Sequence, residues 1–299
     1  MRLAFLLVCL ACTACGSLRP PSVPLLLQSP EINLWSNADS LQSAVPTRWE
    51  GSAADWVAMA RVNEQSFLLM GTPSPPWTAL PLQIATQTSV TVRSTRTIYT
   101  FTAARARINI TFTSPLLLDD WELLSRPAHY VTVSVASDGS SPCDVQIYFD
   151  VTAQVVVRDA STSVQFFRVD IDPSSDEQAR AFPPQASATQ QALRMGGQSQ
   201  SPLSDAKDTP NWGDIYLTVA AASPNVQLAT TLNWVRTSAA FHRCNFSQNH
   251  VGDQHSSGFL FLRNPSALVF RARLSRSSCS PNHYFFRFSR HIWSRYIRR

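Results

Sequence analysis

Several residue types that mark common protein classes are scarce in this 299-residue chain. Charged residues make up only 15% of it, and it has 9 glycines against 20 prolines. Frequent proline argues against long helices, because proline lacks an N–H donor and has a fixed backbone angle. The low charge, with Ser and Thr in place of charged side chains, is typical of an extracellular β protein rather than of a cytosolic helical one.

Cysteine is too rare to supply a disulfide framework. Three of the six cysteines lie within the first sixteen residues, and the others are Cys143, Cys244 and Cys279. The first three have metal-like spacing, but they fall in an apolar leader that is removed, which excludes a metal site there. Three remaining cysteines form at most one pair, and their spacing leaves open which one.

Long apolar runs are also missing. The longest, Leu3 to Ala11, follows the positive Arg2 and is too short to cross a bilayer. Small residues, Ala14 and Gly16, precede a cleavage point, so residues 1–16 are predicted to be a secretory signal peptide. The sequence therefore predicts a secreted, extracellular protein with no membrane partner once the leader is removed.

Motifs that carry enzyme chemistry are not found either. The chain has no Gly-x-Ser-x-Gly elbow, no His-Glu-x-x-His and no Gly-rich phosphate loop before a helix. Asp170, Asp172 and Asp176 partly match a calcium loop, but the glycine at the sixth position and the final Glu are missing. We therefore predict no catalytic residue, no cofactor and no metal.

What the sequence does contain is alternation. Apolar and polar residues alternate around 90–93, 108–112, 131–135 and 145–149. Such alternation places all apolar side chains of a strand on one face. Half-buried antiparallel strands need a second layer, so we predict an all-β, antiparallel two-sheet β-sandwich spanning residues 17–237.

Neighbouring segments refine this prediction. Residues 56–71 indicate a hairpin, and its connection is expected to be a longer loop because Glu64 stands where a tight turn favours glycine. A second place where a glycine with positive φ is expected is occupied by Ala103-Ala104. Residues 151–157 are expected to extend the strand around 145–149, and 163–169 indicate another strand. Residues 170–210 indicate long loops with at most one short helix, and 211–217 and 226–232 indicate further strands.

Five motifs resemble the secreted glutaminase A family. They are Thr-Arg-Thr-Ile-Tyr-Thr-Phe at 95–101, Ser114-Pro115, Asp119-Asp120, Leu-Ser-Arg-Pro at 124–127 and Trp-Gly-Asp at 212–214. The resemblance implies a supersandwich-like N-terminal domain. In that family a C-terminal helical domain carries the hydrolysis of L-glutamine to glutamate and ammonia, and the sandwich would pack on it. No counterpart of the helical domain is found here.

The resemblance ends after about Trp234. Residues 241–299 hold ten Arg and one acid, which gives a charge of +9, while the rest of the chain carries −4. The segment 238–299 has no helical or strand period, so we predict an irregular, disordered basic tail. Its composition fits a frame error, a retained intron or a misjudged gene boundary. A nucleic-acid or membrane-surface tail is the alternative, but a secreted chain seldom meets nucleic acid, and we predict no such partner.

Two groups of residues remain as functional candidates. Asp119, Asp120 and Glu122 form the most concentrated acidic group, which suits a paired-carboxylate site or, as we prefer, the end of a strand and the cap of a helical turn. His129 is expected to be a surface or core residue. Exposed indoles at Trp35, Trp49 or Trp77 would instead fit a stand-alone carbohydrate-binding module.

Two Asn-x-Ser/Thr sequences, at Asn109 and Asn245, are candidate glycosylation sites. Asn109 falls on the predicted polar side of its strand, whereas Asn245 falls in the basic tail. The sequence thus predicts a secreted, glycosylated, non-catalytic N-terminal domain of a truncated glutaminase A-like protein.

Overall fold

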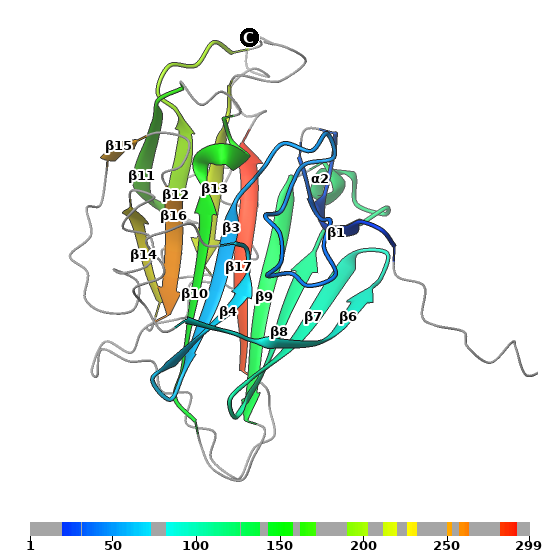
Figure 1. Cartoon of the computed structure of the whole chain (residues 1–299). Helices are drawn as coiled ribbons and strands as arrows, with labels where there is room; N and C mark the ends of the chain where they lie inside the picture. Colours follow the sequence, from blue (N-terminus) through cyan, green and yellow to red (C-terminus); the bar gives the residue numbers. More distant parts are fainter. Residues whose placement is uncertain are drawn as a thin grey trace, which may run out of the picture.

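A computed structural model gives the fold of this chain (Figure 1). It describes residues 20–30, 32–72, 82–125, 127–137, 143–157, 162–171, 190–202, 212–219, 226–231, 250–252, 257–262 and 282–291. The signal peptide, Trp77, Glu122, Cys244, Cys279 and Asn245 lie outside the described residues or have undescribed side chains. Predictions about them stay predictions.

Two large sheets form the body of the molecule. The six-stranded sheet has the spatial order β14 (Val226–Thr231), β16 (Ser257–Leu262), β10 (Val145–Thr152), β3 (Trp56–Val62), β4 (Gln65–Met70) and β5 (Leu82–Ile84). The nine-stranded sheet has the order β15 (His250–Gly252), β11 (Val164–Ile171), β12 (Gln190–Gly197), β13 (Asp214–Val219), β17 (Asn282–His291), β9 (Ala128–Ser137), β8 (Ala106–Thr113), β7 (Arg96–Ala103) and β6 (Thr86–Val92). All pairs are antiparallel except β4 with β5.

The core lies between these sheets. Trp56 and Phe149 of the six-stranded sheet are buried in one apolar cluster with Phe101 and Ile110 of the nine-stranded sheet. Within this cluster the rings of Trp56 and Phe149 meet edge to face, with their centroids 5.6 Å apart. A single core shared by two antiparallel sheets confirms the predicted all-β sandwich.

The predicted alternation is confirmed in β8 and β9. In β6 it is wrong at Val92, which is 37% exposed although the pattern placed it on the inward face with Val90. In β8, Ile108, Ile110 and Phe112 are buried, and the residues between them are half-exposed or exposed. The prediction of a half-buried strand is wrong for β10, in which all eight residues are buried. A strand covered on both faces leaves no polar face to water, and Asp150 instead accepts a hydrogen bond from the Tyr148 hydroxyl at 2.7 Å.

The prediction of a longer loop between the first two hairpin strands is wrong. Only Asn63 and Glu64 join β3 to β4, with φ of 46° and 70°. Positive φ at both central residues defines a tight type I′ turn. Strand pairing up to Val62 and Gln65 imposes this turn, and Asn63 anchors it by accepting a bond from the Asp144 N–H at 3.0 Å.

The positive φ expected at Ala103-Ala104 is confirmed at Ala104. Ala104 and Arg105 join β7 to β8, and Ala104 has a φ of 50°. A positive φ at the first central residue alone matches a type II′ turn. The sequence thus places alanine where the backbone favours glycine.

Two further segments differ from prediction. β12 lies within the region expected to hold long loops with at most one short helix. Its sequence shows no alternation because both faces are buried, as at Ala192 and Leu193. The strand expected to continue through 151–157 ends at Thr152. A single 3-10 turn, η2 (Ala153–Val155), follows it.

The segment 238–299, expected to be an irregular tail, contributes three described strands. β15 pairs with β11, β16 lies between β10 and β14, and β17 lies between β9 and β13. Figure 1 shows β17, in red, beside the green β9. The other residues of this segment lie outside the described part, so the predicted domain boundary at 237 stays a prediction.

A small two-stranded ribbon completes the fold. β1 (Val23–Leu27) and β2 (Asn33–Ser36) pair with each other and lie near the short helix α2 (Trp121–Leu124) (Figure 1). The hydroxyl of Thr97 donates to the carbonyl of Pro24 at 2.6 Å, which ties β1 to β7. This ribbon forms one wall of the candidate site.

Candidate functional site

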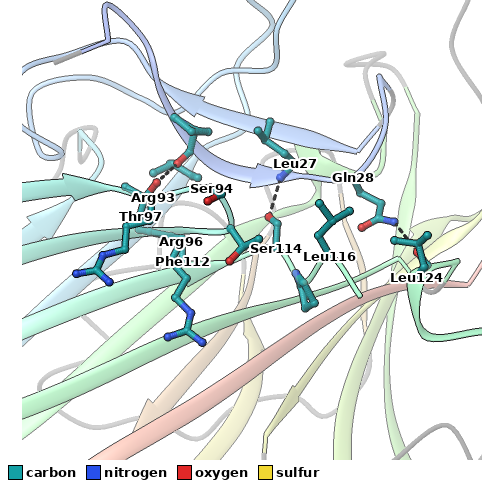
Figure 2. Close-up of a pocket in the computed structure, with 14 residues that line it drawn as sticks. Leu27, Gln28, Arg93, Ser94, Arg96, Thr97, Phe112, Ser114, Leu116 and Leu124 are labelled. Atoms are coloured by element: carbon teal, nitrogen blue, oxygen red, sulfur yellow. Dashed lines mark hydrogen bonds between the residues drawn. The ribbon is translucent and has the colours of Figure 1, made fainter. Parts of the chain in front are cut away.

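A pocket of about 410 Å³ lies where β1 crosses the ends of β7 and β8. Figure 2 shows its lining. The apolar part is formed by Leu27, Phe112, Leu116 and Leu124, and the other end by the turn from Arg93 to Arg96. No carboxylate, cysteine or histidine is among the lining residues, so the pocket presents cations, hydroxyls and apolar side chains.

Ser114 holds this pocket together. Its hydroxyl accepts the N–H of Leu27 at 2.9 Å, and its own N–H donates to the carbonyl of Thr95 at 2.9 Å. On the far side, the Gln28 amide donates to the carbonyl of Leu124 at 3.3 Å. These bonds join β1, the 93–96 turn and α2, three segments far apart in sequence.

His129 lies beneath Ser114 in the core. Its Nδ1 is 3.2 Å from the Ser114 hydroxyl, and its Nε2 is buried with no hydrogen-bond partner among the described groups. Burial lowers the pKa of His129 from 6.5 to about 4, so the ring is neutral at physiological pH. His129 is therefore a core residue, one of the two positions that the sequence allowed.

The two described members of the acidic group, Asp119 and Asp120, are not in the pocket. Asp119 and Asp120 are exposed, and neither lines it. Asp120 directly precedes the single turn of α2, where its carbonyl accepts the N–H of Leu124 at 2.8 Å. This position matches the preferred prediction of a residue that begins a helical turn.

Of the tryptophans considered for carbohydrate binding, the structure describes Trp35 and Trp49, and neither lies on a large sheet. Trp35 is half-buried on β2, and Trp49 is exposed in the loop that follows it. A flat row of exposed aromatic rings would be needed to stack successive sugars. Among the described tryptophans the most exposed is instead Trp121, which the sequence did not single out for a function.

The Trp-Gly-Asp motif has a structural role. Asp214 pairs with Arg194 at 2.7 Å and accepts a bond from the Gln200 amide at 3.0 Å. A Cβ on Gly196 would lie 1.8 Å from the Asp214 carboxylate, and Gly213 has a φ of 99°. The glycines therefore leave room for this network, which links the end of β12 to the start of β13.

Asn109 lies in the middle of β8, on the half-exposed face, opposite Thr100 and Ser134. Its Oδ1 is out of contact with water and has no partner among the described groups. The predicted phase of Asn109 is confirmed. A glycan there stays a prediction.

Among the described residues, no group of three or more His, Cys, Asp or Glu side chains is placed to hold a metal ion. Cys143 is buried with its thiol free. Within the same part of the chain, no helix has the length and apolarity that a bilayer span requires.

Comparison with known proteins then defines the family. Residues 95–259, which run from the pocket turn through β16, match the family described as a domain of unknown function (DUF5127). The chain belongs to this family. The match covers more than half of the chain. It contains Ser114, the acidic residues Asp119 and Asp120, and the network of Asp214 with Arg194 and Gln200.

A curated relative supports the resemblance found in the sequence. Glutaminase A of Aspergillus oryzae (strain ATCC 42149 / RIB 40) is 28% identical over 157 residues. The aligned region is 50% of this chain but 22% of the relative. The chain thus spans about a fifth of the curated relative that it matches, and the similarity to glutaminase A is confirmed for that region.

Proposed function

We propose that this chain is a secreted, non-catalytic N-terminal β-sandwich domain of a glutaminase A-like protein. The observation that carries the proposal is the size of the shared region, which is 22% of glutaminase A. The region shared with the relative belongs to a sandwich in this chain, while most of the relative has no match here. A supporting domain best explains such a partial match.

The chemistry of the described pocket supports this proposal. Amide hydrolysis needs a base for the nucleophile, a proton donor for the leaving amine and donors for the developing oxyanion. The pocket lining offers arginine and hydroxyl donors but no carboxylate or imidazole. Asp119 and Asp120 lie outside it on the surface, and the His129 ring is buried.

Ammonia release from L-glutamine tests the proposal. The purified chain is expected to release no more ammonia than a heat-denatured sample. Asp119→Asn and Asp120→Asn are the informative variants, because both side chains are exposed and their loss should leave the fold intact. Activity that disappears in either variant, with the melting curve unchanged, would show that the sandwich is itself the enzyme.

Secretion and glycosylation belong to the same proposal. A secreted product should begin after Gly16 and carry a glycan on Asn109. N-terminal sequencing and intact mass before and after glycosidase treatment measure both. A product that keeps residues 1–16, or whose mass does not change on treatment and matches the bare polypeptide, would contradict them.

A further inference from the structure

Five of the eight large apolar side chains that the described structure exposes gather on one face. They are Leu27 (40% exposed), Leu116 (58%), Leu117 (47%), Leu118 (67%) and Trp121 (82%). Four of them lie within six consecutive residues. Leu27 joins them because its N–H donates to Ser114 and it lines the same pocket as Leu116. We call this group the leucine face. Contiguous exposed apolar side chains of this kind mark interaction surfaces.

Charges of both signs lie next to the leucine face. Arg93 and Arg96 belong to the turn held next to Ser114 by the bond from the Ser114 N–H to the Thr95 carbonyl, and they line the same pocket as Leu27 and Leu116. The exposed Asp119 and Asp120 follow directly after Leu118 in the sequence. The guanidinium groups extend in one direction, at the far end of the pocket from Leu116 and Leu124 (Figure 2).

A patch that carries apolar side chains together with charges of both signs can complement itself. A two-fold axis through the apolar middle places the arginines of one copy opposite the aspartates of another. The interface of a two-fold dimer uses the same patch twice, so it requires such self-complementarity. Facing opposite charges also orient the encounter of the two copies.

The leucine face also carries a projecting side chain, Trp121, and the opening of the pocket. Trp121 projects into water at the start of α2, while the apolar part of the pocket is open beside it, with Leu124 of the same turn in its wall. Tryptophan that fills a partner's pocket is a common centre of binding energy. In a two-fold pair, each copy offers its Trp121 to the pocket of the other.

We propose that the leucine face is a dimer interface between two copies of this chain. Trp121 of each copy enters the pocket of the other, and Arg93 and Arg96 pair with Asp119 across the axis. The leucine side chains between these pairs become buried, and this removal of apolar surface from water is the main driving force for association.

Sedimentation velocity of the full chain over a range of concentrations tests this dimer. The unchanged chain is expected to dimerise. Leu118→Asp or Trp121→Ala should raise the dissociation constant by about tenfold or more, since each removes a central contact. Ile84→Asp is the matched control, because Ile84 is equally exposed at 68% but lies on β5 of the other sheet. It should leave the dissociation constant unchanged.

Charge reversal gives a second test that loss of folding does not mimic. Arg93→Glu with Arg96→Glu should weaken the dimer, and so should Asp119→Arg. A variant that carries all three changes should recover most of the original affinity, because the pairs are restored with reversed sign. Circular dichroism melting confirms that each variant is folded.

Three outcomes would overturn the proposal. The first is an unchanged chain that stays monomeric at all concentrations. That result would show that the leucine face binds a different polypeptide rather than a second copy. The second is a dimer that Leu118→Asp and Trp121→Ala leave intact. The third is a variant with all three charge reversals whose loss of dimer affinity equals the sum of the losses caused by Arg93→Glu with Arg96→Glu and by Asp119→Arg.

Discussion

Ala104 holds a backbone conformation that alanine avoids. Its φ of 50° costs an L-residue about 1 kcal/mol relative to glycine. Ala104→Gly should therefore raise the free energy of unfolding by about 1 kcal/mol, measured by urea denaturation. Ala136→Gly is the matched control, because Ala136 is exposed in the strand β9 and has no positive φ. It should lower the same free energy by about 0.5 to 1 kcal/mol. Equal effects of the two changes would contradict the assigned turn.

His129 gives the fold a dependence on acid. In the unfolded chain the ring takes up a proton below about pH 6.5, whereas the folded ring does so only near pH 4. The unfolded state therefore binds more protons between these values, and the free energy of unfolding falls as the pH drops through that window. The full effect is about 3 kcal/mol, reached near pH 4 and absent above pH 7.

A neutral substitute isolates this contribution. Urea denaturation of the original chain and of His129→Gln should give curves whose difference changes between pH 6.5 and 4 and is constant above pH 7. The carboxyl groups of both proteins titrate alike, so they cancel in the difference. A constant difference over the whole range would show that His129 titrates normally in the folded state.

At the scale of the element, the phase of β8 is the feature that organises the sandwich. Ile110 is fully buried between Ile108 and Phe112. Ile110→Asp places a carboxylate in the apolar core and should cost at least about 3 kcal/mol. Thr91→Asp, at an exposed position on the edge strand β6, should change stability by less than about 0.5 kcal/mol. Similar melting temperatures for both variants would show that β8 is out of phase.

Alternation predicted the phase of β8 and β9, which keep one face half-exposed, but it did not predict burial on both faces elsewhere. In β8 and β9 most half-exposed positions hold Thr, Ser or Asn, so the sequence repeats with a period of two. Positions of β10 and β12 are buried on both faces, which removes the need for a polar partner at every second residue. The turn at Glu64 was missed because pairing of its flanking strands outweighs the local preference for glycine.

At the scale of the whole molecule, the candidate site depends on contacts that no local pattern encodes. Leu27, Thr95 and Ser114 meet through two hydrogen bonds although they are separated by about seventy and twenty residues in sequence. The motif around Ser114 was recognised, but the cavity beside it arises only when β1 crosses the sheet. For the same reason Trp121 had no predicted role, since its exposure follows from the fold.

The basic segment provides the last prediction at this scale. Its composition indicates an irregular tail, yet β17 pairs along ten residues between β9 and β13. A strand bonded on both edges protects its amides, so 286–289, which pair with both neighbours, should exchange hydrogen as slowly as β8, which also lies between two strands. Hydrogen-exchange mass spectrometry of the full chain measures both segments together, and the edge strand β6 serves as the internal reference for partial protection. Exchange in 282–291 that is complete at the earliest time point, with β8 still protected, would show that β17 is unpaired and that β9 and β13 meet water at those edges.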